Sequence, residues 1–209
     1  MLQTHSLQFS YNPQNTFSFP DIRLNAGENL LILGDSGIGK TTLLHLLAGL
    51  LKAQSGEIKI ADVEFSKLSS KDADRFRGQN IGLVFQKPHF MSSLNLLENL
   101  LLVQKLAGKK ADKALCLSRL GKVGLEGKAS QKTQSLSQGE RQRASIAMAT
   151  INQPQLILAD EPTASLDDGN CQKVLDLLLT QAQETQSNLI IITHDARVKP
   201  YFSHIISLT

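Results

Sequence analysis

A glycine-rich stretch at residues 34–42 constrains this chain more than any other feature of its sequence. The stretch reads Gly-Asp-Ser-Gly-Ile-Gly-Lys-Thr-Thr, follows the apolar run 30–33 and leads into the leucine-rich segment 43–48. This order is typical of a buried strand, a loop and a helix, and the spacing Gly-x-x-x-x-Gly-Lys-Thr is the P-loop pattern. Glycines let such a loop curl until successive N–H groups face phosphate oxygens, and the helix N-terminus adds positive charge. The stretch therefore predicts a site for nucleotide phosphates.

Each residue of this stretch is a candidate contact for a bound nucleotide. We expect the Lys40 ammonium to reach the β- and γ-phosphates and the Thr41 hydroxyl to ligate Mg²⁺. The simpler alternative is a chance glycine-rich turn, and the strand and helix patterns on its two sides argue against it. The predicted nucleotide ligands are Gly34, Asp35, Ser36, Gly37, Ile38, Gly39, Lys40, Thr41 and Thr42.

Composition bounds the class of protein. The chain has 209 residues, 41% of them apolar and 20% charged, which suits one globular domain. The net charge of +3 is small and its basic residues are scattered, so we expect no nucleic-acid partner. The N-terminus lacks the pattern of a signal peptide, and the leucine-rich stretch 94–106 is too short and too polar to span a bilayer. Membrane association would therefore need a partner protein.

Four apolar runs predict the strands of a parallel sheet. Near-continuous apolar strands that alternate with helical patterns are typical of a sheet covered by helices on both faces. A last short strand is expected at 204–208. The four runs lie at 30–33, 81–85, 156–159 and 189–192.

The other segments add an antiparallel part and a helical part. Alternating apolar residues on both sides of a turn signal at 12–15 predict an N-terminal hairpin, and two short strands are expected around 58–65. The segment 67–78 is expected to be an exposed loop with a short helix. Longer helices are expected at 40–51, 95–107, 112–121, 140–152 and 169–186. We predict a single α/β domain, 1–209, with a core and antiparallel β part at 1–86 and 153–209 and a helical subdomain at 87–152.

Polar residues follow the four apolar strands. Gly34, Gln86, Asp160 and His194 each come just after a strand. In parallel sheets ligands sit beyond the carboxyl ends of the strands, so these residues are expected to converge although they are distant in sequence.

Their side chains suit phosphoryl transfer from ATP. Asp160 could hold Mg²⁺, and Glu161 could take a proton from the attacking water or orient it. Gln86 could bridge Mg²⁺ and that water, and His194 could donate a hydrogen bond to the γ-phosphate. Taken alone, the acids could be solvated loop residues, the glutamine a polar strand end and the histidine structural. Their common position beyond the strands, together with the P-loop, favours the catalytic interpretation.

The run 136–143, Leu-Ser-Gln-Gly-Glu-Arg-Gln-Arg, resembles the signature loop of the ATP-binding cassette (ABC) ATPases. Other elements of that family match in the same order along nearly the whole chain. They are Tyr11 as the adenine-stacking aromatic, 34–41 as Walker A, Gln86 as the Q-loop glutamine, 156–161 as Walker B, Ser165-Leu166-Asp167 as the D-loop and His194 as the switch histidine.

This resemblance implies a P-loop NTPase fold of ABC type, with two cassettes packed head to tail around two ATP molecules. Each site would combine the Walker A loop of one chain with Ser137, Gln138, Gly139 and Glu140 of the other. A hydroxyl and a bare N–H at a helix start form an anion site suited to a γ-phosphate. The pair would be a homodimer or a pair with a related cassette.

The run 84–90, Val-Phe-Gln-Lys-Pro-His-Phe, followed by 94–99, Leu-Asn-Leu-Leu-Glu-Asn, is similar to the cassettes of lipoprotein-release, macrolide-export and cell-division ABC systems. In those systems a groove near the Q-loop receives a helix from a membrane permease. The stretch 94–106 has enough apolar residues to line such a groove, although its leucines could equally pack within the helical part.

The chain also departs from the family pattern. Gln138 stands for a glycine of the signature loop, and Glu140 for a glutamine. Asp35 and Ile38 replace the usual proline or asparagine and serine or cysteine, and a carboxylate at 35 would weaken the affinity for nucleotide phosphates.

We therefore predict an ATP-hydrolysing subunit that works at the inner face of the cell membrane through a separate integral permease. It would itself be cytoplasmic. One alternative is a soluble ABC-type ATPase that acts on a protein or nucleic-acid assembly. A second is a cassette that binds ATP without hydrolysing it, which the presence of Lys40, Asp160, Glu161 and His194 argues against.

Overall fold

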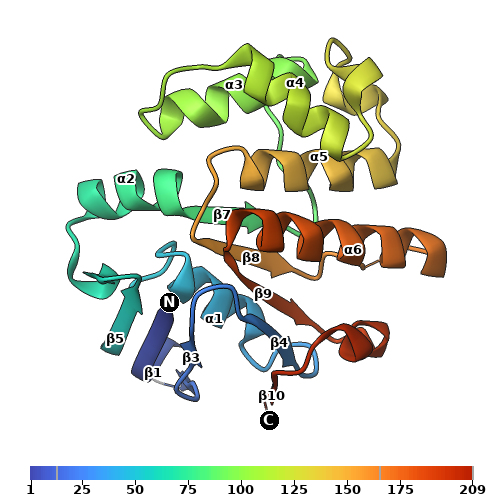
Figure 1. Ribbon diagram of the computed structural model, residues 1–209. Coiled ribbons are helices and arrows are strands. Elements are labelled where there is room, and N and C mark those ends of the chain that lie inside the picture. The colour runs from blue at the N-terminus through green and yellow to red at the C-terminus, as the bar shows by residue number, and fades with distance from the viewer. Residues whose placement is uncertain (13, 165, 209) are drawn as a thin grey trace.

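A parallel sheet forms the centre of the chain (Figure 1). The computed structural model describes residues 1–12, 14–164 and 166–208. The strands of this sheet are β4 (Asn29–Leu33), β7 (Ile81–Val84), β8 (Leu156–Asp160), β9 (Asn188–Thr193) and β10 (Ile205–Ser207). They are ordered β10-β4-β9-β8-β7, and each neighbouring pair is parallel, so the sheet expected from the apolar runs is confirmed.

A second sheet is antiparallel and includes the N-terminal hairpin. Its strands are β1 (Leu2–Asn12), β2 (Asn15–Ser18), β3 (Arg23–Leu24), β5 (Ser55–Ile60) and β6 (Val63–Glu64). β1 lies between β2 and β5, and Phe9 pairs with Phe17 across the hairpin. The predicted hairpin and the two short strands after residue 55 are therefore confirmed.

The helices lie around and between these sheets (Figure 1). They are α1 (Lys40–Leu47), α2 (Ser70–Asn80), α3 (Leu96–Leu106), α4 (Lys113–Lys122), α5 (Gln138–Thr150) and α6 (Asp168–Thr185), with the 3₁₀ helices η1 (Phe65–Lys67), η2 (Glu126–Lys128), η3 (Thr133–Ser135) and η4 (Ala196–Tyr201). Helices α3, α4 and α5 gather at one end of the molecule, away from β1 and β10 (Figure 1). They follow β7 and precede β8, as expected for the helical insert.

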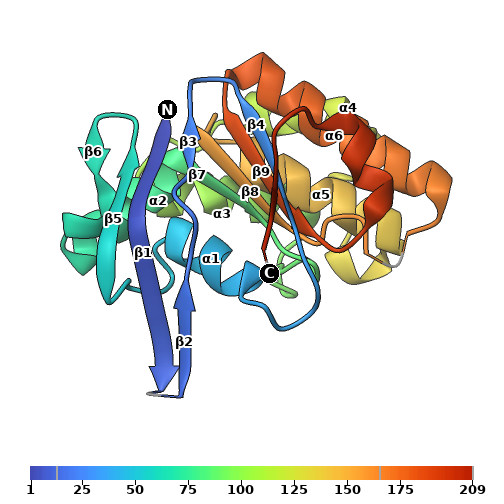
Figure 2. The same ribbon diagram turned by 90° about the horizontal axis from the view of Figure 1, so that it is seen from below.

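The parallel strands bury both of their faces because successive side chains point to opposite sides. Leu30 and Ile32 of β4 pack in one cluster with the leucines of α1 and the inner face of the antiparallel sheet. Leu31 packs in another cluster with Val174 and Leu178 of α6. Helix α1 consequently lies between the two sheets (Figure 2).

The starts of α3 and α4 agree with the sequence prediction, whereas the end of α1 does not. Asn95 and Asp112, where the sequence predicts two helices to begin, cap α3 and α4 with their side chains. The expected end of the first helix at residue 51 is wrong, because α1 stops at Leu47. Carbonyls of its last turn accept hydrogen bonds from the N–H groups of residues 48–51, and Gly49, with a φ of 64°, turns the chain out of the helix. The Arg77 guanidinium donates to the Ala48 and Gly49 oxygens just beyond the helix.

Two other boundaries also differ from expectation. Helix α5 begins at Gln138, because a capping box between Ser137 and Glu140 starts it before residue 140. Helix α2 covers 70–80 and begins at the Ser69 cap, so the short helix expected within 67–78 is present and extends two residues beyond that segment.

Within the described ranges, the helices are all too short or too polar to cross a membrane. The two cysteines are both free and buried. Burial raises the pKa of the Cys116 thiol to about 11, so this thiol stays protonated at neutral pH.

Candidate nucleotide-binding site

The loop between β4 and α1 has the glycine-dependent shape that its sequence predicts. Gly37 and Gly39 have φ angles of 87° and 98°, a region that residues with a side chain rarely adopt. A β-carbon on Gly39 would also lie 2.6 Å from the ring of Phe17, so both backbone and space require glycine there. These φ angles fit the tight curl that a phosphate-binding loop needs before the first turn of α1.

Lys40 lies at the centre of this loop. Its ammonium donates hydrogen bonds to the carbonyl oxygens of Gly34 and Asp35, both at 2.8 Å, and the residue is 7% exposed. The ammonium is also 4.0 Å from Glu161 Oε1, which comes from the end of β8. The β4 and β8 strand ends are thus brought together, as the sequence predicts.

Asp160 and Thr41 form the second contact between these strand ends. The Thr41 hydroxyl donates to Asp160 Oδ2 at 3.2 Å. Burial raises the pKa of Asp160 and outweighs the lowering by the Thr41 hydrogen bond, and the neighbouring Glu161 raises it further. The pair offers a carboxylate and a hydroxyl, which are hard oxygen ligands.

Glu161 is held in an unusual backbone conformation beyond β8. Its φ is 46°, in the left-handed region that costs a residue with a side chain about 1 kcal/mol or more, and its N–H donates to the Ile192 carbonyl on β9 at 2.9 Å. Its Oε1 lies 2.8 Å from His194 Nδ1, and its Oε2 accepts a 2.6 Å hydrogen bond from the Thr193 hydroxyl. Lys40, Glu161 and His194 therefore meet at one edge of the parallel sheet.

Tyr11 lies beside the same loop. Its hydroxyl is 3.2 Å from the Thr42 hydroxyl on α1, and its ring packs edge-on against Phe9 and Phe17. With 55% of its surface exposed, the ring can receive a flat partner from solvent.

Comparison with known proteins decides the family. A family model described as "ABC transporter" matches residues 18–164. The chain belongs to the ABC transporter family. It is 39% identical over 191 residues to the lipoprotein-releasing system ATP-binding protein LolD of Legionella pneumophila (strain Lens), covering 90% of this chain and 84% of that one. It is 42% identical over 178 residues to LolD of Pseudoalteromonas translucida, covering 84% and 76%.

Solved structures of cassettes have the same fold. The dimeric post-hydrolysis structure of the ATP-binding cassette MJ0796, bound to ADP and Pi, superposes with a TM-score of 0.90 at 30% identity and covers 100% of this chain and 94% of that one. CbiO1 from Clostridium perfringens, part of the ABC transporter complex cbiONQ, gives 0.88 at 27% identity, covering 100% and 84%. The predicted ABC-type fold is thereby confirmed for this chain.

The ABC signature residues lie apart from the chain's own P-loop. Ser137 caps α5, and Glu140 accepts its N–H and pairs with Lys128 at 2.8 Å. The Lys128 ammonium and the Ser137 N–H hold the pKa of Glu140 at about 2. Among the described residues, no hydrogen bond or ion pair joins 137–140 to the P-loop.

The predicted Q-loop residue lies beside α5, and the predicted D-loop residue Asp167 lies at the start of α6. Gln86 is exposed beyond β7 and lines a pocket of about 260 Å³ with Gln138 and Leu166. Among the described residues, the Gln86 amide makes no hydrogen bond to Lys40 or Asp160. Asp167 caps α6, whereas Ser165 of the predicted D-loop lies outside the described residues.

The structure also shows site residues that the sequence did not single out. The Thr193 hydroxyl donates a hydrogen bond to Glu161 and accepts one from the Asp195 N–H. The Arg197 guanidinium in turn donates to the Asp195 carboxylate. Their one sequence signal is their place within four residues of His194, at the end of a predicted strand.

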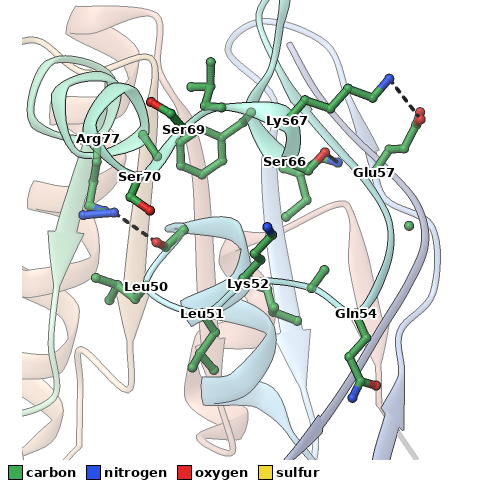
Figure 3. Close-up of a pocket in the computed structure, with 18 of the residues that line it drawn as sticks. Leu50, Leu51, Lys52, Gln54, Glu57, Ser66, Lys67, Ser69, Ser70 and Arg77 are labelled. Atoms are coloured by element: carbon green, nitrogen blue, oxygen red, sulfur yellow. Dashed lines mark hydrogen bonds and ion pairs between the residues drawn. The ribbon is translucent and has the colours of Figure 1, made fainter.

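A pocket of about 660 Å³ lies elsewhere in the molecule (Figure 3). It is bounded by the end of α1, β5, η1 and α2, and its charged side chains are partly paired, as between Lys67 and Glu57 at 3.6 Å. Arg77 points across it toward the Gly49 carbonyl (Figure 3). It includes none of the predicted nucleotide or signature residues.

A third pocket is a mainly apolar groove between α2, β7, α3 and α5. It has a volume of about 470 Å³ and is lined by Phe85, Val103, Leu106 and Met148, among others. Leu106 is 76% exposed and lies at the edge of this groove. Of the stretch 94–106, only Val103 and Leu106 line this groove, whereas its other leucines, Leu96, Leu97, Leu100 and Leu101, pack within the helical part, as the alternative predicted.

Proposed function

We propose that this chain binds Mg-ATP at the P-loop and hydrolyses it to drive a separate membrane permease. Glu161 would take a proton from the attacking water or orient it, and His194 and Gln86 would contact the γ-phosphate and the water. The observation that carries this assignment is the cluster of Lys40, Glu161 and His194, with separations of 2.8 and 4.0 Å to Glu161. Lys40 would neutralise phosphate charge, while Tyr11 would stack on the base.

Magnesium fits the residues beside the P-loop. Thr41 and Asp160 would hold Mg²⁺ with Gln86, and the ion would neutralise charge on the transferred phosphoryl group. The raised pKa of Asp160 fits this assignment, because a cation would compensate the buried negative charge.

We further propose that two copies, or this chain and a related cassette, close around two ATP molecules. MJ0796, which is 30% identical, was solved as a dimer bound to ADP and Pi. The signature residues of this chain open α5, away from the chain's own P-loop, and Ser137 with Gly139 forms an anion site there. A second copy would bring that site to the γ-phosphate, and the D-loop residue Asp167 would face the same interface.

The apolar groove is the proposed docking site for a helix of the permease. The relatives named LolD are parts of lipoprotein-releasing systems, and the groove has the exposed Leu106 and the half-buried Met148, which a helix can cover. Binding there would place the chain at the inner face of the cell membrane without a spanning segment of its own. The alternative of a soluble ATPase without a permease predicts no such partner.

Leu106→Glu should separate the chain from its permease. A carboxylate on the groove edge would oppose burial against an apolar helix, so native purification should recover at least tenfold less of the co-purifying membrane protein. The ATPase activity of the isolated chain should stay within about twofold of wild type, because Leu106 contacts no nucleotide residue. Leu117→Glu on α4 is the matched control, since Leu117 is also exposed and lies outside the groove. Equal recovery with both variants, or no membrane protein with wild type, would favour the soluble alternative.

Asp35→Asn should tighten ATP binding about fivefold. The Asp35 side chain is exposed on the P-loop, and a like charge a few ångströms from the phosphates costs about 1 kcal/mol in a solvated setting. Calorimetric titration with a non-hydrolysable ATP analogue measures the dissociation constant directly. Asp62→Asn, at an exposed position outside the site, controls for the change in net charge. An unchanged affinity in Asp35→Asn would show that the carboxylate faces away from the phosphates.

A further inference from the structure

The hydroxyl of Thr193 has a fixed direction. Thr193 ends β9 and is fully buried, and its Oγ1 lies 3.0 Å from the Asp195 N–H and 2.6 Å from Glu161 Oε2. A backbone N–H can only donate, and a hydroxyl has a single hydrogen. Thr193 therefore accepts from Asp195 and donates to Glu161, at a length typical of a hydroxyl bound to a carboxylate.

This hydrogen bond sets the orientation of the Glu161 carboxylate. With Oε2 turned toward Thr193 in the protein interior, Oε1 faces Lys40 and His194. The last torsion of a glutamate side chain is intrinsically broad, so the carboxylate would otherwise sample other orientations. The hydroxyl thus restricts a group whose direction matters for contact with water.

Thr193 is itself held by Asp195. The Asp195 carboxylate accepts hydrogen bonds from the Thr163 hydroxyl at 2.9 Å, the Arg197 N–H at 3.0 Å and the Arg197 guanidinium at 2.8 and 2.9 Å. The Arg197 guanidinium, opposed in part by burial, holds the pKa of this carboxyl at about 2. These contacts to its carboxylate fix the position of Asp195, whose backbone N–H donates to the Thr193 hydroxyl.

The same arginine reaches the segment before α6. Arg197 Nη1 lies 2.6 Å from Asp168 Oδ1, and both terminal nitrogens lie 3.4 Å from the Leu166 carbonyl. A continuous set of polar contacts thus runs from Glu161 through Thr193, Asp195 and Arg197 to residues 166–168.

We propose that Thr193 is a positioning residue for Glu161, anchored through Asp195 and Arg197 to the segment 166–168. The inference rests on the proposed function, because it requires Glu161 to act on the attacking water. It predicts an effect on turnover and none on nucleotide binding.

Thr193→Val removes the hydroxyl and keeps the shape of the side chain. Its kcat for Mg-ATP should fall about 10- to 100-fold, while KM and the ATP dissociation constant stay within about twofold. Thr193→Ser retains the hydroxyl and should keep kcat within about threefold of wild type. Thr150→Val removes a hydroxyl that is equally buried but bonds only to carbonyls of its own helix, and it should leave kcat unchanged.

Thermal denaturation of each variant checks that it is folded. If Thr193→Val does not fold, the exposed Arg197 provides the test: Arg197→Ala should lower kcat severalfold with unchanged ATP binding, and Lys199→Ala, on the same short helix, should not. A folded Thr193→Val with wild-type kcat, or equal losses in the valine and serine variants, would overturn the inference. If Glu161→Gln itself keeps wild-type turnover, the proposed function fails first, so the two failures are distinguishable.

Discussion

Glu161→Gln should slow ATP hydrolysis by about 10²- to 10⁴-fold and leave ATP binding intact. The substitution keeps the size of the side chain and can keep the hydrogen bond from Thr193, which now ends on an amide oxygen. It removes the basic carboxylate that faces Lys40 and His194. The P-loop contacts of Lys40 and the pairing of Thr41 with Asp160 do not involve this carboxylate, so nucleotide affinity should stay near wild type.

Two measurements check this result. Steady-state phosphate release gives kcat, and light scattering at saturating Mg-ATP gives the oligomeric state, which should be a stable dimer because hydrolysis no longer opens it. Lys40→Ala is the informative control, since it should lose both nucleotide binding and the dimer. Near-wild-type turnover in Glu161→Gln would remove Glu161 from the proposed chemistry, and a monomer at saturating ATP would contradict the closed pair.

Much of the fold could be predicted because its signals are local. The four apolar strands are continuous in sequence, and Asn95 and Asp112 cap helices through residues only three positions away. The end of α1 also has a local signal, because Gly49 adopts a φ of 64° and the N–H groups after the helix donate back to carbonyls of its last turn. The leucine pattern continues past this glycine and therefore predicts too long a helix. The contact of Arg77 with the Ala48 and Gly49 carbonyls was not predictable, because about 30 residues separate them and only the tertiary structure brings them together.

The residues of the site could also be predicted from the sequence, but not the orientation of their side chains. The P-loop, Asp160, Glu161 and His194 each follow an apolar strand, and a parallel sheet aligns such ends. The direction of the Glu161 carboxylate was not predictable, because it depends on the register of β8 against β9. That register places the Ile192 carbonyl and the Thr193 hydroxyl beside Glu161. The surroundings of the Gln86 side chain were also not predictable from its place after β7, since it lines a pocket together with residues of α5.

Mixing two inactive variants should restore activity if each ATP site combines two chains. Lys40→Ala disables the P-loop half-site, and Gly139→Asp places a carboxylate where the γ-phosphate would meet the signature loop. A β-carbon on Gly139 would come no closer than 3.7 Å to its neighbours, so this substitution should not disturb the fold. Each variant alone should lose at least about 100-fold in turnover, because every site then lacks one of its charge-stabilising halves.

In a mixed dimer of these variants, one site carries both defects and the other carries neither. An equal mixture should therefore recover up to about a quarter of wild-type activity if the two sites act independently, since half of the dimers are mixed and each has one intact site. The matched control is the double variant Lys40→Ala, Gly139→Asp mixed with either single variant, which should show no recovery because no dimer in that mixture has an intact site. Gly139→Asn, which adds similar bulk without charge, separates electrostatic repulsion from steric exclusion. Wild-type turnover in Gly139→Asp alone, or no recovery in the mixture, would contradict a site shared between two chains.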